Sequence, residues 1–172
     1  MKRLIILVFI IGNIFSVYSQ TAKTAIPIVI PNWITGTWEL VSVTNSYLNG
    51  NIVYPYGANP RGLLIFDGTG NYALQIYKAA RLTVASGDKN NCTAEENAAL
   101  VQGSNSHFGK YVVDDIDHTI TFHIEYASFP NWNYNQQKRV FSFTDNQLQY
   151  IVTNTTQGGG SVVAKVVWKR KR

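Results

Sequence analysis

The feature that most constrains the fold of this 172-residue chain is an alternation of short and long connections between strand-like segments. Segments rich in β-branched and aromatic residues occur at about 37–45, 62–66, 71–77, 109–114, 119–126, 138–143, 148–153 and 162–169. The second, fourth and sixth connections are short turns, and the others are clearly longer. In an antiparallel meander alternate connections fall at the same end, so the pattern predicts one tight end and one elaborated end.

This pattern favours an all-β fold: a closed, eight-stranded, antiparallel up-and-down barrel whose long loops surround a mouth. The alternative is a two-sheet sandwich with a filled core. One short helix is expected in the third connection, because Thr93 and Glu96 have the spacing of a capping box. A barrel of this size can enclose one small ligand.

The net charge of +5 suggests a nucleic-acid partner, but the positions of the charges argue against one. Two of the fifteen basic residues lie in the first 19 positions, and four form the run 169–172. The remaining nine basic residues face ten acidic residues, so the body of the chain has a net charge of −1. A nucleic-acid groove needs positive charge spread along one face, so we expect no nucleic-acid partner.

The N-terminus has the pattern of a cleavable secretory signal. Lys2 and Arg3 precede a mostly apolar stretch, and Ser19 ends a small-residue cleavage pattern. We therefore expect a secreted or periplasmic protein with no transmembrane segment in its mature chain. The predicted organisation is a signal peptide at 1–19, an irregular lead-in at 20–35 and a barrel domain at 36–172.

Motifs for metals and cofactors are not found in this sequence. The three histidines, His107, His118 and His123, match no common ligand spacing, and Cys92 is the single cysteine. A phosphate loop, a dinucleotide fingerprint and a Gly-x-Ser-x-Gly nucleophile motif are also missing. We therefore expect no metal, no cofactor and no internal disulfide.

Several short motifs together resemble a known family. Gly36-Thr37-Trp38 opens the first strand, and the last strand ends with Trp168-Lys169-Arg170. This is similar to the lipocalin pattern, in which a Gly-x-Trp packs near a late basic residue and closes the narrow end of the barrel. The chain more specifically resembles the lipocalin-like domain proteins of bacteria and fungi, which are distinct from true lipocalins. The matching stretches include 36–40, 55–57, 60–66, 68–72, 108–111, 123–125, 130–132 and 137–139.

The resemblance implies a calyx for a small hydrophobic or amphipathic molecule. It also implies that Gly36, Trp38, Trp168 and Arg170 close the barrel. The mouth is expected to carry aromatic side chains of the first and fifth connections, which suit a small-molecule rim or pack loop against loop. The candidate ligand-binding residues are Tyr56, Arg61, Tyr72, Tyr111, His123, Glu125, Trp132 and Arg139.

His123 and Glu125 form the candidate catalytic pair, because residues two apart on a strand share a face. If that face is the lumen, His123 can act as a general acid or base that Glu125 orients, and Arg139 can pair with Glu125 or with an anionic ligand. If it is the outer face, the residues form a surface histidine beside a cross-strand ion pair. The apolar Ile120, Phe122 and Ile124 occupy the opposite face and argue for the second interpretation.

Three functional hypotheses follow from these observations. The first is a secreted lipocalin-like protein that binds a small hydrophobic or amphipathic molecule. The second is an enzyme on the same fold, of the isomerase, cyclase or hydrolase type, that uses His123 and Glu125. The third is a barrel filled by its own side chains that serves as an interaction module. The presence or absence of a cavity, and the residues in its wall, distinguish them.

Overall fold

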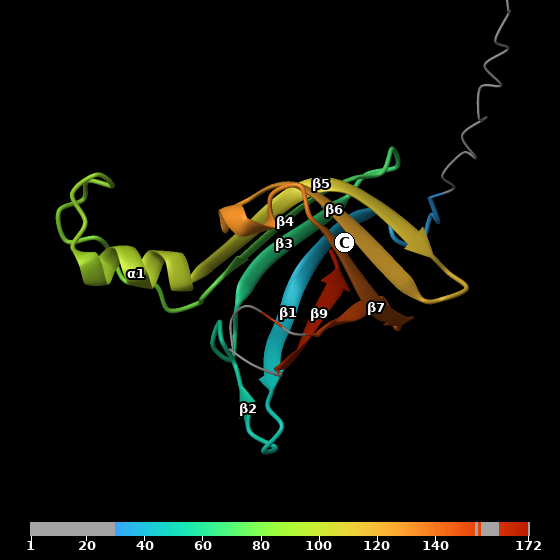
Figure 1. Ribbon diagram of the computed structural model, residues 1–172, viewed down its shortest axis with the longest axis horizontal. Helices are drawn as coiled ribbons and strands as arrows, with labels where there is room; N and C mark the ends of the chain where they lie inside the picture. The colour runs from blue at the N-terminus through green and yellow to red at the C-terminus, as the bar shows by residue number, and fades with distance from the viewer. Residues whose placement is uncertain (1–29, 154, 156–161, 172) are drawn as a thin grey trace, which may run out of the picture.

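A computed structural model describes residues 30–153, 155 and 162–171 of the chain, and these residues form mainly strands (Figure 1). The long strands have alternating buried and exposed residues, as expected for a sheet with one buried face. The elements are β1 (Gly36–Ser46), β2 (Ile52–Val53), β3 (Arg61–Phe66), β4 (Asn71–Tyr77), α1 (Ala94–Gln102), β5 (Ser104–Asp114), β6 (Thr119–Ala127), the short 3-10 helix η1 (Pro130–Trp132), β7 (Gln136–Thr144), β8 (Gln147–Thr153) and β9 (Val163–Arg170).

The strands pair in the order β2-β1-β3-β4-β5-β6-β7-β8-β9, and β9 also pairs with β1. All these pairings are antiparallel, and the closing pair runs from Trp38–Arg170 to Ser46–Val163. The short β2 pairs only with the end of β1. The prediction of a closed eight-stranded antiparallel barrel is therefore confirmed, and the sandwich alternative is wrong because the first and last strands are hydrogen-bonded to each other.

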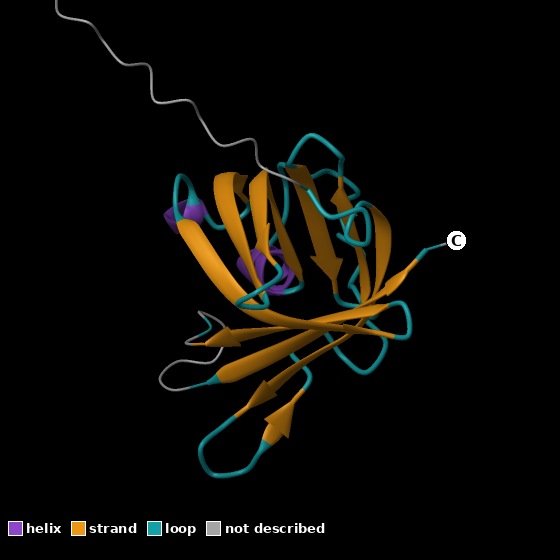
Figure 2. Ribbon diagram, turned by 90° about the vertical axis from the view of Figure 1, so that its right-hand side faces the viewer, coloured by secondary structure: helices purple, strands orange, loops and turns teal. Residues whose placement is uncertain are grey.

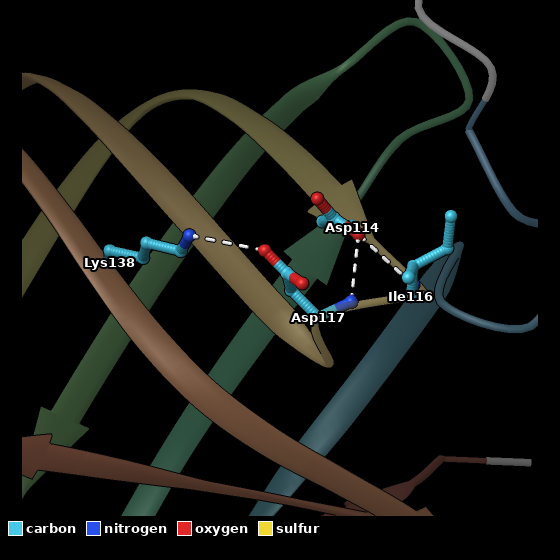
Figure 3. Close-up of polar contacts among 4 residues, drawn as sticks. All are labelled: Asp114, Ile116, Asp117 and Lys138. Atoms are coloured by element: carbon cyan, nitrogen blue, oxygen red, sulfur yellow. Dashed lines mark hydrogen bonds and ion pairs between the residues drawn. The ribbon is translucent and has the colours of Figure 1, made fainter.

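The two ends of the barrel differ as the connection lengths predicted. The turns after β3, β5 and β7 lie at one end, while the connections that contain β2, α1 and η1 lie at the other. In the turn after β5, the carboxylate of Asp114 accepts hydrogen bonds from the amides of Ile116 and Asp117, at 3.0 and 2.9 Å (Figure 3). Asp145 and Asn146 both adopt positive φ between β7 and β8, as in tight hairpin turns.

The half of the barrel nearest the short turns is filled with large side chains. Trp38, Leu64, Ile120, Leu148 and Trp168 are completely buried there. Aromatic rings add to this packing, since the rings of Phe66 and Tyr111 lie 4.6 Å apart between centroids. Burying large apolar side chains supplies about 1.5–3 kcal/mol each, so this half is the main source of stability.

The helix α1 stands outside the barrel. The predicted capping box is confirmed, because the amide of Glu96 donates to the Thr93 hydroxyl and the Glu96 carboxylate accepts from the Thr93 amide. None of its residues is buried, and Figure 1 shows it beyond the strands, so that in Figure 2 it is seen behind the barrel. Within the described ranges, no helix is both long and apolar enough to cross a membrane.

Some elements differ from the sequence-based expectations. The fourth predicted strand began at residue 109, but β5 begins at Ser104, so His107 belongs to a strand rather than to a loop. The stretch 104–107 contains two serines and an asparagine, which have low strand propensity and hid the strand. The short β2 and η1 were not expected. The predicted signal peptide and most of the lead-in at 20–35 lie outside the described residues.

Candidate functional site

Arg170 closes the narrow end of the barrel against the chain that precedes β1. Its guanidinium carbon lies 4.4 Å from the centre of the Trp38 ring, which is a cation–π geometry. The same guanidinium donates hydrogen bonds to the carbonyl of Thr35, at 2.7 Å, and to the carbonyl of Trp33. Gly36 passes so close that a Cβ there would lie 3.0 Å from Nη1 of Arg170. The four residues assigned to barrel closure therefore lie at this end.

The other half of the barrel encloses a cavity of about 320 Å³. The cavity lies below the long connections, between the filled half and the mouth, because its wall uses the mouth-side residues of the strands. Val43, Leu74, Phe122 and Val166 give this wall its apolar part. The remaining lining residues are Asn45, Tyr56, Ile76, Asn105, His107, Trp132, Gln136, Gln137, Lys138, Arg139, Tyr150, Val152, Thr153, Thr155 and Ala164.

A polar cluster of Tyr72, His107, Arg139, Tyr150 and Gln137 occurs at this cavity. Nδ1 of His107 lies 2.8 Å from the Tyr72 hydroxyl, so one of these two groups donates a hydrogen bond to the other. The Arg139 guanidinium donates a hydrogen bond to Oε1 of Gln137. Both Arg139 and Gln137 point inward because they alternate along β7 with the exposed Gln136, Lys138 and Val140.

The ionisation of this cluster is shifted by burial. Burial and, as the smaller cause, the positive charge of Arg139 together lower the pKa of His107 to about 3, so the imidazole is neutral at pH 7. Burial raises the pKa of Tyr150 to about 12 and also raises the pKa of Tyr72. The Arg139 pKa is lowered by the same desolvation. At neutral pH the cluster therefore carries one positive charge, on Arg139, and a histidine that is a weak base.

Two asparagine side chains of the cavity wall have unsatisfied oxygens. Oδ1 of Asn45 and Oδ1 of Asn105 are buried and have no hydrogen-bond partner in the described structure. Buried polar groups in folded proteins nearly always have a partner, from the protein, from water or from a ligand. These two side chains are therefore polar groups of the wall that a bound molecule can satisfy.

A groove outside the mouth adjoins the cavity. It runs between the connection that carries α1 and the connection that carries η1, and it shares Asn105 and Trp132 with the cavity wall. Lys78, Arg81 and Lys89 line it. No aspartate or glutamate belongs to the part of its lining that the structure describes. We call this groove the basic vestibule.

The structure brings some of the candidate ligand-binding residues together and separates others. Tyr56, Trp132 and Arg139 line the cavity. Tyr72 is not part of the cavity wall, but its hydroxyl lies within hydrogen-bond distance of His107, which is part of the wall. Tyr111 is buried in the filled half, where its hydroxyl donates to the carbonyl of Asp67 at 2.8 Å. Arg61 is exposed and lines neither hollow.

His123 and Glu125 lie on the outer face of the barrel, which is the second of the two arrangements that the sequence left open, and neither residue lines the cavity. Phe122 and Ile124 are buried at 1–2% exposure and point inward, so the alternating His123 points outward. Glu125 is the extra residue of a β-bulge, because Gly109 pairs with Ile124 while Phe108 pairs with Tyr126. Glu125 is exposed and forms no ion pair with Arg139. The proposed acid–base pair therefore has no access to the cavity.

His107 is the histidine that the cavity contains, and the sequence analysis gave it no role. No alternation of apolar and polar residues marks this segment, because the inward positions 105, 107 and 109 are Asn, His and Gly while the outward Phe108 is apolar. In the described residues, no three histidine, cysteine, aspartate or glutamate side chains gather as a metal site would require.

The fold and the cavity together define a calyx, a closed antiparallel barrel with one filled end and one hollow end. Residues 35–171 match the lipocalin-like domain family, and the chain belongs to it. No curated protein matches the chain. A solved structure of EF1p2_mFAP2b bound to DFHBI aligns at 12% identity over 81% of this chain and 94% of that chain, with a TM-score of 0.39.

Proposed function

We propose that this protein binds one small amphipathic molecule in the mouth half of its barrel. The observation that carries the proposal is the division of the barrel into a filled half and a cavity of about 320 Å³. Ligand pockets for small molecules start at about 300 Å³ and combine an apolar wall with a few polar groups. This cavity has both, since the apolar Val43, Leu74 and Val166 line it together with the polar Asn45, His107 and Arg139.

Two neighbouring residues of β9 allow the proposal to be tested with a matched control. Ala164 lines the cavity, whereas Val163 points to solvent with 42% of its surface exposed. We expect Ala164→Phe to occupy the cavity and to weaken binding of the neutral probe N-phenyl-1-naphthylamine by about 10-fold or more. Val163→Phe adds the same ring to the outer face and is expected to bind the probe as the wild type does.

Fluorescence titration of the probe measures these affinities, and circular dichroism checks that each variant is folded. Val152→Phe is a second variant of the cavity wall, because Val152 is half-buried and lines the cavity from β8. The proposal is wrong if both cavity variants remain folded and bind the probe like Val163→Phe. It is also wrong if the wild-type protein does not bind the probe.

The other two functional hypotheses have less support. An enzyme that uses His123 and Glu125 would need these side chains at the cavity, but they lie on the outer face. A filled barrel would leave no room for a ligand, but the mouth half is hollow. Binding in the lumen is therefore the function that the geometry supports best.

We further propose that the protein is exported and that its leader is removed after Ser19. The support is the sequence of the N-terminus, in which Lys2 and Arg3 precede an apolar stretch that ends in small residues. The intact mass and N-terminal sequence of the protein recovered from a periplasmic or secreted fraction provide the test. The expected mature chain begins at Gln20, and an uncleaved chain in that fraction would contradict the proposal.

A further inference from the structure

We infer that the ligand is an anion whose carboxylate binds the Arg139 guanidinium inside the barrel. This inference rests on the proposed function and names the chemical class of the molecule that the cavity accepts. The ligand is then a carboxylic acid with an apolar body, held by its charged end. Three observations support it, namely the position of Arg139, its lack of a counterion and the charge of the basic vestibule.

The position of Arg139 is fixed by the alternation of β7. Lys138, the preceding residue, points to solvent, and its ammonium lies 3.9 Å from the carboxylate of Asp117 (Figure 3). Arg139 then points inward, and it lies between Gln137 and the buried Phe141 on the same face. The two adjacent cations of this strand are thus treated differently. Both residues border the cavity, but the side chain of Lys138 is exposed and pairs with an acid, whereas the side chain of Arg139 is half-buried.

Arg139 has no acidic partner inside the barrel. Of the salt bridges that the described residues form, Lys138–Asp117 is the only one, so no carboxylate lies within 4.0 Å of Arg139. Glu125, the acidic residue nearest in sequence to the facing part of β6, is exposed and does not pair with Arg139. Among the residues that the structure describes, the guanidinium makes one hydrogen bond, to Gln137, which leaves several of its N–H donors for a ligand. A cation held away from bulk water is stabilised when an anion with acceptor oxygens binds beside it.

The surroundings of Arg139 suit the carboxyl end of such a ligand. A guanidinium presents parallel N–H groups that match the two oxygens of a carboxylate. The hydroxyl of Tyr150 and the neutral His107 lie in the same cluster, and neither carries a negative charge that would repel an anion at pH 7. The apolar side chains of Leu74, Phe122 and Val166 line the rest of the cavity and suit the apolar body.

The basic vestibule gives independent support from outside the barrel. Lys78, Arg81 and Lys89 surround a groove that shares Asn105 and Trp132 with the cavity. The Arg81 guanidinium lies 4.9 Å from the centre of the Tyr77 ring, which holds this cation near the mouth. Charges of one sign around an entrance raise the local concentration of oppositely charged ligands. Asp88, Glu95 and Glu96 belong to the same connection but do not line the groove, so its described lining carries positive charge only.

Competition between a neutral probe and two matched ligands tests the inference. Decanoate and 1-decanol share an apolar chain and differ in charge at pH 7.5, and each displaces N-phenyl-1-naphthylamine from the cavity. We expect the wild type to bind decanoate about 10-fold or more tightly than 1-decanol, because only the carboxylate can form a charge-assisted hydrogen-bonded pair with the guanidinium. Arg139→Gln is expected to lose this preference and to keep the affinity for 1-decanol.

Lys165→Gln is the matched control, since Lys165 is exposed on β9 between the inward Ala164 and Val166, and its loss changes the net charge equally. It is expected to retain the preference for decanoate. Arg139→Lys, which keeps the charge, is expected to keep part of it. The inference is overturned if the wild type binds both ligands equally, or if a folded Arg139→Gln variant keeps the preference. If the neutral probe does not bind the wild type, the proposed function itself fails, and the two failures are thereby distinguished.

Discussion

Replacement of Arg170 tests how the narrow end of the barrel is held closed. The side chain makes two hydrogen bonds to the carbonyls of Thr35 and Trp33 and covers the Trp38 ring. Hydrogen bonds to charged groups contribute about 1.5–3 kcal/mol each when buried, and partial exposure of Arg170 places them at the lower limit. A cation–π contact of this kind adds about 0.5–1 kcal/mol. We therefore expect Arg170→Ala to lower the free energy of unfolding by about 3–4 kcal/mol.

Urea unfolding followed by tryptophan fluorescence measures this change, because Trp38 lies directly under the guanidinium. For a chain of this length the loss corresponds to a decrease in Tm of about 6–16 °C. Arg170→Lys keeps the charge but not the planar group that holds both carbonyls, so a loss of about half as much is expected.

Lys169→Ala is the matched control for this series. Lys169 is the exposed neighbour of Arg170 on β9, and its removal is expected to change stability by less than about 0.5 kcal/mol. An Arg170→Ala variant as stable as Lys169→Ala would refute the reasoning, since the contacts of Arg170 would then contribute nothing to closure of the barrel.

Three further predictions concern the bulge, the buried histidine and the vestibule. Gly109→Ala is expected to lower the free energy of unfolding by more than about 2 kcal/mol in thermal unfolding, because its Cβ would lie 2.1 Å from the carbonyl oxygen of His123. The control is Gly68→Ala, whose Cβ would have no neighbouring atom within 4 Å and which is expected to be nearly neutral. His107 has a pKa of about 3 in the folded protein and about 6.5 in the unfolded chain, so between these pH values the unfolded chain binds one more proton than the folded protein. The free energy of unfolding is therefore expected to fall by up to about 1.4 kcal/mol per pH unit as the pH is lowered from 6.5 to 3. Urea titrations of the His107→Gln variant should lack this pH-dependent contribution. Replacing Lys78 and Arg81 with Gln is expected to slow association of decanoate in stopped-flow measurements and to weaken its salt dependence, and an unchanged association rate would contradict electrostatic steering.

The fold was largely predictable because its signals are local and repeated. Turn residues at 67–70, 115–118 and 144–147 divide the chain into strands, and the alternation of turn lengths indicates a meander. The capping box of Thr93 and Glu96 similarly identifies a helix from four residues. Closure could be expected from Trp38 and Arg170 through the family resemblance, because both residues carry a motif.

The site was less predictable because side-chain direction depends on tertiary structure. On β6 both faces contain side chains that suit a lumen, and the apolar Phe122 and Ile124 take the inner face. Their burial leaves His123 outside, and the bulge at Gly109 then displaces Glu125. His107 was missed because its serine and asparagine neighbours have low strand propensity, so the sequence places it in a loop. Its burial comes from pairing with β4 and β6, which no local pattern encodes.

The most direct test of the central claim locates a bound ligand within the barrel. Methyl-labelled protein titrated with N-phenyl-1-naphthylamine can be followed by NMR, because aromatic rings shift the signals of methyl groups that they contact. Binding in the lumen predicts shifts at Val43, Leu74 and Val166, which line the cavity, and none at the exposed Ile116 and Val140. Shifts confined to Ile116 and Val140, or no shifts at any of these methyl groups, would contradict the claim that this barrel holds a small molecule.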